Sequence, residues 1–291
     1  MTDIRYGLIE AGGTKFVLGV ADSNGEILAR HRIPTTTPEA TLPQMQAWLS
    51  GHGPFQAIGL ATFGPVELDP ASSDWGHILK TPKPGWSGAD LVGPLKDKFD
   101  CPIAVDTDVN AAALAEAEWG AGRGHGSVLY FTVGTGVGGG AVIAGKTLRG
   151  QGHPEMGHIR LARHPDDLQF SGACPFHGDC LEGLASGPSI IARWGQSLSD
   201  LPADHPAHDI IAHYLAQTVV TMQAIFEPGR IVFGGGVMAT PGLLQRVVDQ
   251  AEKLGGGYFR TRASDIVTAP ELGENAGLLG ALAIALSSTS G

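Results

Sequence analysis

Two glycine-rich turns built on the same plan constrain the fold of this chain more than any other feature. Apolar runs flank the turn Gly12–Lys15 near the N-terminus, and apolar runs also flank the turn Gly134–Gly140. Short runs rich in β-branched and aromatic residues, joined through glycines, are typical of two strands around a turn. Because glycine has no Cβ, the backbone N–H groups of such a turn can approach a phosphate closely. Two similar phosphate-binding hairpins at the starts of two halves therefore predict a duplicated domain that binds one nucleotide.

The second turn also satisfies a different nucleotide-binding pattern. Gly134, Gly136 and Gly139 fit G-x-G-x-x-G, which indicates a dinucleotide site only where a helix follows the last glycine. Here the chain continues as a second apolar run, Ala141–Ala144, and breaks again at Gly145. Neither turn contains the G-x-x-x-x-G-K-[ST] pattern of a P-loop. An ordinary glycine-rich β-turn would explain one copy alone, but the repeated plan favours paired phosphate hairpins over an NAD-dependent oxidoreductase.

Composition narrows the class of protein. The chain has 291 residues, 43% of them hydrophobic and 16% charged, which is typical of a globular protein with one large or two modest domains. Its formal net charge of −10 argues against a nucleic-acid-binding surface built on net basic charge. No apolar run reaches membrane-spanning length, and the N-terminus lacks the pattern of a signal peptide. Three cysteines do not make a secreted disulfide framework, so we expect a cytoplasmic protein without membrane or nucleic-acid partners.

The order of predicted elements indicates a mixed α/β architecture in two parts. The first half is predicted to run β-β-β-α-β-α-β-α, with helices over residues 41–50, 88–99 and 110–119. The second half repeats this order from Ser127 onward, interrupted by a polar insertion over residues 153–182. We place the domain boundary at Asp108, so that residues 1–108 form an N-terminal α/β domain and residues 109–276 a C-terminal one. The Ala- and Leu-rich helix within residues 277–291 is expected to pack back on the first domain.

A polar cluster over residues 106–110 (Asp-Thr-Asp-Val-Asn) lies where a predicted strand meets a helix. Thr, Asp and Asn are favoured N-cap residues, so helix capping is one interpretation. Capping needs only one such side chain, and several polar groups at the carboxyl end of a strand are also typical of a catalytic site. If the reaction is phosphoryl transfer, one aspartate would accept the proton of the attacking hydroxyl. These residues alone leave the two interpretations balanced.

The polar insertion contains a metal-binding spacing. Cys174, His177 and Cys180 follow a Cys-x-x-His-x-x-Cys pattern, with Pro and Gly inside a tight loop. Structural zinc takes four such ligands in a tetrahedron. His158 is the nearest candidate for the fourth ligand; the weaker candidates are His153, His164 and Asp179. Two unpaired thiols and a chance histidine are the alternative interpretation, which the close match to zinc-loop spacing disfavours.

Two glutamates accompany these ligands in the sequence. Zinc bound at this loop would fix Glu155 and Glu182 in position beside His158. Carboxylates held beside a polar loop can accept hydrogen bonds from sugar hydroxyls. Solvated surface charge is the alternative interpretation for both glutamates. The histidines later in the chain are expected to face solvent, namely His205, His208 and His213.

These motifs together resemble one known family. Their order along the chain is Glu10–Lys15, Asp108 with Asn110, Gly134–Gly140, Glu155–His158 and Cys174–Glu182. The combination is similar to the ROK family of sugar kinases, and within it to the bacterial fructokinase branch, whose members carry E-A-G-G-T-K and C-P-x-H-G-D-C-L-E-G. The resemblance implies an actin-like ATPase (ribonuclease H-like) fold of two similar domains around a cleft, commonly in a homodimer. It also implies ATP with Mg²⁺, a hexose substrate and a structural Zn²⁺.

The resemblance assigns roles to particular residues of this chain. Asp108 matches the catalytic base of the family. The positions that match nucleotide-binding residues are Gly12, Gly13, Thr14, Lys15, Thr135, Gly136, Gly235 and Gly236. The positions that match sugar-binding residues are Glu155, His158 and Glu182. The positions that match zinc ligands are His158, Cys174, His177 and Cys180.

Some residues depart from the family pattern. Glu10 stands where many members have Asp, which bears on the water-mediated Mg²⁺ contacts. Thr107 stands where many glucokinases of the family have Asn, and their Cys-rich loop differs from the loop found here. Both differences favour fructose over glucose, while mannose stays open.

The expected reaction is transfer of the ATP γ-phosphate to O6 or O1 of a hexose, with D-fructose to fructose 6-phosphate as the leading case. A non-catalytic sugar sensor is the alternative from another class, since the family includes repressors. Those repressors carry an N-terminal helix-turn-helix, whereas this acidic chain starts directly on a predicted strand. The sequence therefore favours the kinase.

Overall fold

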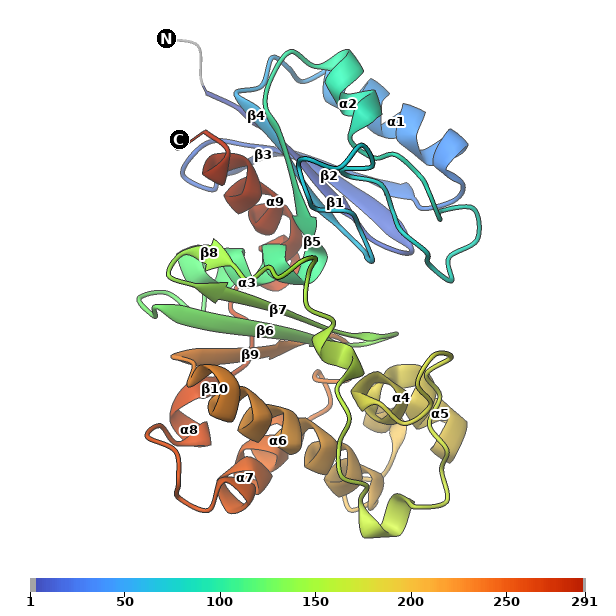
Figure 1. The fold of residues 1–291 in the computed structure, drawn as a ribbon, viewed down its shortest axis with the longest axis vertical. Helices are drawn as coiled ribbons and strands as arrows, with labels where there is room; N and C mark the ends of the chain where they lie inside the picture. Colours follow the sequence, from blue (N-terminus) through green and yellow to red (C-terminus); the bar gives the residue numbers. More distant parts are fainter. Residues whose placement is uncertain (1–3, 290–291) are drawn as a thin grey trace. The chain divides into compact units, whose positions relative to one another are not determined.

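The computed structural model describes residues 4–289, and the chain divides into two compact units (Figure 1). The first unit comprises the chain up to Glu118, the segment Thr147–His153 and the chain from Leu272 onward. The second comprises Trp119–Lys146 and Pro154–Glu271. The sequence placed the boundary at Asp108, ten residues before the first unit leaves off at Glu118, so the helix that starts at Asp108 belongs almost wholly to the first unit.

The first unit contains a five-stranded sheet in the order β3-β2-β1-β4-β5. Its strands are β1 (Tyr6–Ala11), β2 (Lys15–Ala21), β3 (Ile27–Pro34), β4 (Ala57–Thr62) and β5 (Ile103–Thr107). The first three strands form an antiparallel meander, whereas β4 and β5 run parallel to β1. The helices of this unit are α1 (Pro38–Ser50), α2 (Gly93–Lys98), α3 (Asp108–Trp119) and α9 (Ala276–Ser287), with the 3₁₀ turn η4 (Gly273–Asn275) before α9.

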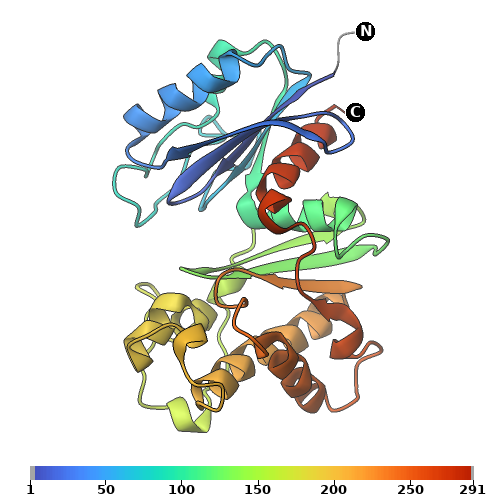
Figure 2. The same cartoon turned by 180° about the vertical axis from the view of Figure 1, so that it is seen from behind.

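Helices cover both faces of this sheet (Figures 1 and 2). Side chains alternate across a strand, so Phe16 and Leu18 of β2 join one core together with Met45 of α1. On the opposite face α9 approaches the backbone closely, because a Cβ on Gly59 of β4 would lie 1.8 Å from the carbonyl oxygen of Ala281. Only glycine permits that distance, and the pairing fixes where the C-terminal helix lies on the first sheet.

The second unit contains a sheet in the order β10-β9-β6-β7-β8. Its strands are β6 (Ser127–Val133), β7 (Val137–Ile143), β8 (Lys146–Thr147), β9 (Arg230–Gly234) and β10 (Val267–Thr268). Matching these in chain order with the strands of the first unit gives the same arrangement, with β6 and β7 antiparallel and β9 and β10 parallel to β6. The duplication predicted from the two glycine-rich turns is therefore present.

The remaining elements of the second unit carry the polar insertion and the helical layer. The helices are α4 (Leu181–Ala185), α5 (Gly187–Trp194), α6 (Ala207–Phe226), α7 (Leu243–Gly255) and α8 (Ala263–Ile266). The 3₁₀ turns are η1 (Met156–His158), η2 (Pro165–Asp167) and η3 (Leu198–Asp200). Helices α6 and α7 lie side by side below the sheet in Figure 1.

The strand that follows the second glycine-rich turn excludes the dinucleotide-binding interpretation of that turn. Strands β6 and β7 pair antiparallel, with Val133 opposite Val137 and Thr132 opposite Gly138. A dinucleotide fingerprint requires a helix at this point, and the chain instead forms a hairpin.

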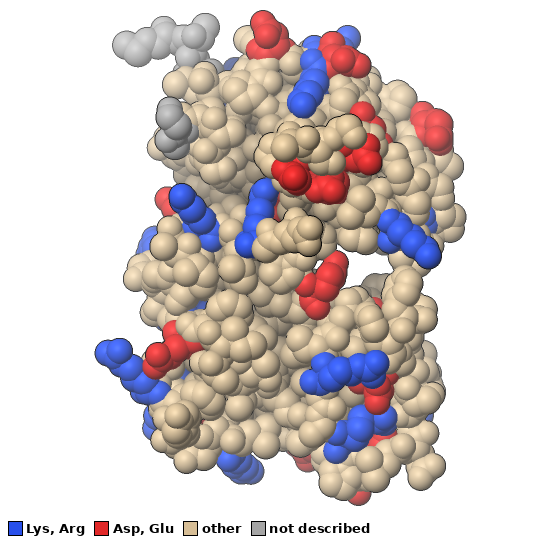
Figure 3. Space-filling view, viewed as in Figure 1, with Lys and Arg blue, Asp and Glu red and all other residues tan. Residues whose placement is uncertain are grey.

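Two expectations from composition concern the apolar character of the helices and the distribution of basic side chains. Within residues 4–289, no helix is both long enough and apolar enough to span a bilayer. On the face shown in Figure 3, Lys and Arg side chains are scattered rather than gathered into one basic stripe.

Candidate active site

The polar cluster of residues 106–110 forms the strand–helix turn at the start of α3. Thr107 is the N-cap, because its Oγ1 accepts a hydrogen bond from the Asn110 N–H at 3.2 Å. Asp106 is 2% exposed, and its Oδ1 accepts hydrogen bonds from the Thr107 N–H and from Asn110 Nδ2, both at 2.8 Å. Capping and internal bracing therefore account for Thr107, Asp106 and Asn110.

Asp108 is the first residue of α3 and differs from Asp106 in exposure. Its side chain is only partly buried, and Oδ1 accepts a hydrogen bond from the Val109 N–H at 2.8 Å. The partial positive charge at a helix N-terminus favours a carboxylate there. Of the two aspartates in this turn, Asp108 is the more exposed.

The first glycine hairpin is braced from both sides. The Gly12 N–H donates to the Lys15 carbonyl at 3.0 Å, and a Cβ on Gly12 would lie 2.8 Å from that oxygen. Thr35 Oγ1 donates to the Gly12 carbonyl at 2.7 Å, and Lys83 Nζ donates to the Gly13 carbonyl. Residues 13–15 are exposed. The predicted nucleotide-binding residues of this hairpin thus form a fixed turn open to solvent.

Glu10 precedes this hairpin at the end of β1. Burial raises the pKa of its carboxyl above the ordinary value of 4.5, while Lys15, Arg30 and Arg32 act in the opposite direction. A Cβ on Gly277 would lie 2.1 Å from the carboxyl carbon, so the side chain lies against the first turn of α9.

The second hairpin and the glycine pair after β9 come together in the second unit. The Gly134 carbonyl accepts the N–H of Gly187, the first residue of α5, at 2.7 Å. At the β9 junction Gly235 has φ +94°, and a Cβ there would lie 2.4 Å from the Val133 carbonyl oxygen. That oxygen also accepts the Val237 N–H at 2.9 Å. These contacts, with a Cβ on Gly134 3.9 Å from the Gly236 nitrogen, bring the start of the turn that carries Thr135 and Gly136 to the pair Gly235 and Gly236.

Glu182, the second residue of α4, is tied to the same hairpin. Its Oε2 accepts the Val137 N–H at 3.1 Å and would lie 2.8 Å from a Cβ on Gly136. The side chain is half-buried, so the alternative of a solvated surface carboxylate does not describe it.

The Glu155–His158 motif is shaped by its packing on β7. A Cβ on Gly157 would lie 1.7 Å from the Val137 carbonyl oxygen, so only glycine fits there. Met156 is buried, and a Cβ on Gly139 would lie 2.7 Å from the Met156 Cβ. This packing directs exposed Glu155 to one end of η1 and half-buried His158 to the other.

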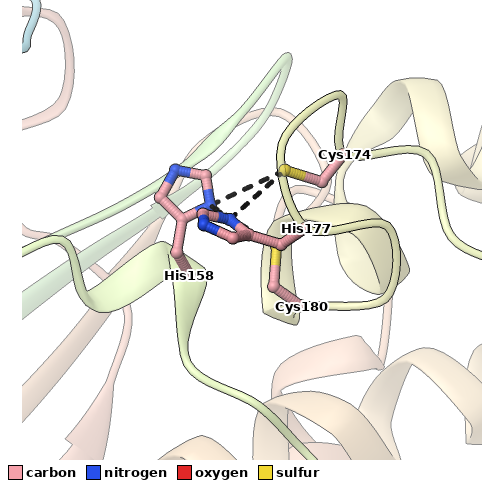
Figure 4. A group of neighbouring side chains, drawn as sticks. All are labelled: His158, Cys174, His177 and Cys180. Atoms are coloured by element: carbon pink, nitrogen blue, oxygen red, sulfur yellow. Dashed lines mark hydrogen bonds between the residues drawn. The ribbon is translucent and has the colours of Figure 1, made fainter.

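Figure 4 shows the four predicted metal ligands converging: His158, Cys174, His177 and Cys180. Their ligand atoms lie within 4.8 Å of one another. Nδ1 of His158 lies 3.3 Å from Nδ1 of His177 and 3.4 Å from Sγ of Cys180. Sγ of Cys174 lies 3.7 Å from the His177 Nδ1 and 3.8 Å from the His158 Nδ1.

The four pairwise distances from 3.3 to 3.8 Å are close to those around a tetrahedral zinc ion. Zn–N and Zn–S bonds of about 2.05 and 2.3 Å in a tetrahedron separate two nitrogens by about 3.3 Å and a nitrogen from a sulfur by about 3.6 Å. Burial raises the pKa of the Cys180 thiol to about 11; a hydrogen bond with the Gly183 backbone acts against this shift, and Cys174 and Glu182 add to it. A cation among these atoms would favour the thiolate. The donor set therefore suits zinc.

Backbone hydrogen bonds hold the ligands in this arrangement. Cys174 and Gly178 exchange N–H···O bonds of 3.1 and 2.9 Å, which close the loop between the two thiols. The Leu181 N–H donates to the Ile159 carbonyl at 3.0 Å, bringing the residue after Cys180 beside the residue after His158. This backbone hydrogen bond thus joins the segment of His158, which is distant in the sequence, to the loop that carries the two cysteines.

Sequence reasoning missed two residues that act on the α3 turn. Thr147 Oγ1 and Arg149 Nη2 both donate to Asp106 Oδ2, at 2.9 and 2.7 Å. They lie 41 and 43 residues from Asp106 in the sequence, and no local spacing signals the contact.

One expectation outside the site was wrong. His208 is 4% exposed, and its Nε2 lies 3.0 Å from the Pro202 carbonyl oxygen, so it is a buried residue of α6 rather than a solvent-facing one. The helical periodicity of α6 directs that position inward.

Two units with the same strand order, each starting from a glycine hairpin, define the duplicated α/β fold of the actin-like ATPases. The family model described as "ROK family" matches residues 6–288, and this chain belongs to the ROK family. Both the fold and the family predicted from the sequence are confirmed.

Known relatives span the whole chain. The chain is 50% identical over 290 residues to the fructokinase of Zymomonas mobilis subsp. mobilis, covering 97% of this chain and 96% of that protein. Its fold is similar to the crystal structure of the ROK hexokinase from Thermus thermophilus, with a TM-score of 0.82, 28% identity and coverage of 99% and 100%. It is also similar to a ROK family glucokinase from Streptomyces griseus in complex with glucose and AMPPNP, with a TM-score of 0.75, 27% identity and coverage of 97% and 99%.

Proposed function

We propose that this protein is an ATP-dependent hexose kinase that converts D-fructose to fructose 6-phosphate. The observation that carries the proposal is the 50% identity to the Zymomonas mobilis fructokinase over nearly the full length of both chains. The Streptomyces griseus glucokinase, described with glucose and an ATP analogue, supports the same class of reaction at 27% identity. The higher identity to the fructokinase favours fructose over glucose.

The nucleotide is assigned to the two hairpins and the β9 junction. In the first unit, the exposed turn of residues 13–15 presents backbone N–H groups and the Lys15 ammonium, which suit phosphate oxygens. In the second unit, the turn that carries Thr135 and Gly136, which starts beside Gly235 and Gly236, is assigned to phosphate as well. Mg²⁺ supplied with ATP would offset charge on the phosphoryl oxygens, and Glu10 is the nearest acidic residue to the first turn in the sequence.

The hexose is assigned to Glu155, His158 and Glu182. His158 directs Nδ1 at the metal cluster, so Nε2 is the ring atom that we assign to a sugar hydroxyl. Glu182 engages the second hairpin through Oε2, which makes Oε1 the acceptor assigned to a second hydroxyl. Glu155 is exposed at the start of η1 and is assigned to a third.

We further propose that His158, Cys174, His177 and Cys180 hold a structural zinc ion. The convergence of two imidazoles and two thiols at tetrahedral separations supports this assignment. Bound zinc would fix the ring orientation of His158 and hold the start of α4, where Glu182 lies. We also propose a homodimer, which the family resemblance implies.

Asp108 is the proposed general base. Its carboxylate would take the proton of the attacking O6 hydroxyl as that oxygen approaches the γ-phosphorus in line with the leaving oxygen. The bracing of Thr107 and Asn110 against Asp106 holds the backbone on either side of Asp108, so the carboxylate is positioned before substrate binds.

Coupled ADP release with MgATP and a panel of fructose, mannose, glucose and N-acetylated hexosamines tests the function. Preference for fructose supports the proposal, and preference for another hexose corrects the substrate. Absence of ADP release with every sugar, from folded zinc-loaded protein, contradicts the kinase.

Asp108→Ala tests the base. We expect this variant to lose nearly all turnover, about 10²-fold or more, while fructose binding measured by calorimetry survives. Near-wild-type turnover in Asp108→Ala would refute its assignment as base.

A further inference from the structure

The segment Thr147–His153, called the strap below, runs from β8 toward the Glu155–His158 motif and belongs to the first compact unit. It passes the carboxyl end of β5 and the start of α3 (Figure 1). Arg149 of the strap donates through Nη2 to Asp106 Oδ2 at 2.7 Å and to the Val105 carbonyl at 3.3 Å. Its Nη1 donates to the Leu68 carbonyl at 3.4 Å. One guanidinium thus binds a carboxylate and two backbone carbonyls of the first unit.

The carboxylate of Asp106 is held at both oxygens. Its Oδ1 accepts from the Thr107 N–H and Asn110 Nδ2, both at 2.8 Å. Its Oδ2 accepts from Thr147 Oγ1 at 2.9 Å and Arg149 Nη2 at 2.7 Å. The side chain is 3% exposed, so its charge depends on these protein donors rather than on water. Asp106 therefore connects the strap to the first turn of α3.

We propose that Arg149, assisted by Thr147, is a positioning residue for Asp108 and acts through Asp106. Asp108 lies between Thr107 and Asn110, the two residues that Asp106 holds. A buried carboxylate that loses its cationic partner reorients or admits water, which releases the turn that carries the base. A shift of about 1 Å in a catalytic group can cost about 10²-fold in rate. The inference rests on the proposed role of Asp108 as general base.

Arginine is required here for a geometric reason. The planar guanidinium can donate in several directions at once and reaches Asp106, Val105 and Leu68 together. A lysine ammonium on a flexible stem keeps the charge but cannot hold the same three acceptors. We therefore expect Arg149→Lys to retain only part of the function of Arg149.

The chain offers a matched control for this ion pair. Arg246 donates through Nη1 to Asp209 Oδ1 at 2.6 Å and through Nη2 to the Ala203 carbonyl at 3.0 Å. Its side chain is 37% exposed, against 36% for Arg149, but Asp209 is 60% exposed and lies on α6. Arg246→Ala removes a comparable arginine without touching a buried carboxylate or the base.

The test compares Arg149→Ala, Arg149→Lys and Thr147→Val with Arg246→Ala in the coupled ADP assay, with the melting temperature and zinc content of each protein measured alongside. We expect kcat to fall about 10²-fold in Arg149→Ala and less in Arg149→Lys, with KM for fructose and ATP changed by no more than about threefold. Added guanidinium ion in the low millimolar range should restore part of kcat in Arg149→Ala and have no such effect on wild type. If Arg149→Ala does not fold, the isosteric Thr147→Val decides, with kcat expected to fall several-fold.

Other results would overturn the proposal. These are a kcat of folded Arg149→Ala within twofold of wild type, a loss that lies in KM alone, an equal loss in Arg246→Ala, or no guanidinium rescue of Arg149→Ala. Asp108→Ala in the same series separates this inference from the proposed function. If Asp108→Ala is inactive and Arg149→Ala is normal, the positioning role fails and the function stands. If wild type releases no ADP with any hexose, the proposed function fails first.

Discussion

Gly157→Ala tests whether the close approach of η1 to β7 holds the predicted sugar and zinc residues in place. A Cβ at this position would lie 1.7 Å from the carbonyl oxygen of Val137, and real Cβ contacts essentially never fall below 3.0 Å. The two backbones must therefore separate by at least 3.0 − 1.7 = 1.3 Å. Both sides of the contact are backbone, so no change of rotamer relieves it. His158 is the next residue, and Glu155 lies two residues earlier, so the shift moves both.

The size of the effect follows from this displacement. Overpacking costs about 1–3 kcal/mol, and a contact between two backbones belongs at the upper end of that range. A loss of about 3 kcal/mol lowers Tm by roughly 6–12 °C in a protein of this size. Metal–ligand distances tolerate only about 0.2 Å, so a shift of more than 1 Å in His158 should release zinc. We expect turnover to fall about 10²-fold or more.

Calorimetry, elemental analysis for zinc and the ADP assay check these three effects together. Gly126→Ala is the control, because no atom lies within 4 Å of a Cβ added there. If Gly157→Ala kept the zinc content and turnover of wild type with a Tm lowered by less than about 2 °C, η1 would be free to move and the packing argument would be wrong.

Two further predictions concern the metal and a buried charge. Elemental analysis should show that Cys180→Ser loses bound zinc. The control Cys101→Ser alters a thiol outside the cluster and should keep zinc. Zinc retained in Cys180→Ser would exclude Cys180 as a ligand. Burial raises the pKa of Glu10 above 4.5 in the folded protein, so folding favours the protonated carboxyl. The protonated carboxyl therefore contributes its full stability below pH 4.5, and this contribution is lost as the pH rises through the folded pKa. Glu10→Gln should therefore raise Tm at neutral pH and have little effect near pH 4, and a difference independent of pH would contradict the burial argument.

The features that sequence predicted well are those specified by local chemistry. The hairpin at Gly134–Gly140 was predictable because glycines between short apolar runs permit few other structures. The same holds for Cys174–Cys180, where three ligands occur in seven residues. Of the four candidates for the remaining ligand, the nearest one, His158, is the one that lies in the cluster, and the hydrogen bond between Leu181 and Ile159 brings it to the loop.

Helix boundaries were predicted less well, although the signals were partly present. The helix predicted from residue 41 begins at Pro38, with Thr37 as N-cap and proline in the first turn, where its missing N–H costs nothing. The helix predicted from residue 88 begins at Gly93, because Asp90 Oδ1 accepts the Val92 and Gly93 N–H groups and forms a turn first. Proline at the first helical position sets the boundary of α1, and a side chain that accepts backbone N–H groups sets that of α2, so apolar periodicity sets neither.

The bracing of the α3 turn could not be predicted from the sequence. A strand–helix junction with four polar residues is equally suited to capping and to catalysis, and which role each residue takes depends on which side chain is buried. Asp106 is buried because Arg149 and Thr147 reach it from a segment more than 40 residues away. Such a contact carries no local period or spacing, and it becomes visible only when the strap is seen against β5.

The duplication produces two hairpins with the same strand plan but different electrostatic surroundings. In the first turn, a hydroxyl and an ammonium group, from Thr35 and Lys83, hold the backbone carbonyls. In the second turn, the carboxylate of Glu182 accepts the Val137 N–H. An anion cannot share that N–H with a carboxylate without repulsion, so we expect a phosphate bound at the second turn to avoid the Val137 N–H. The bracing residues have thus diverged while the strands are unchanged, and under the proposed assignments this divergence distinguishes the two turns.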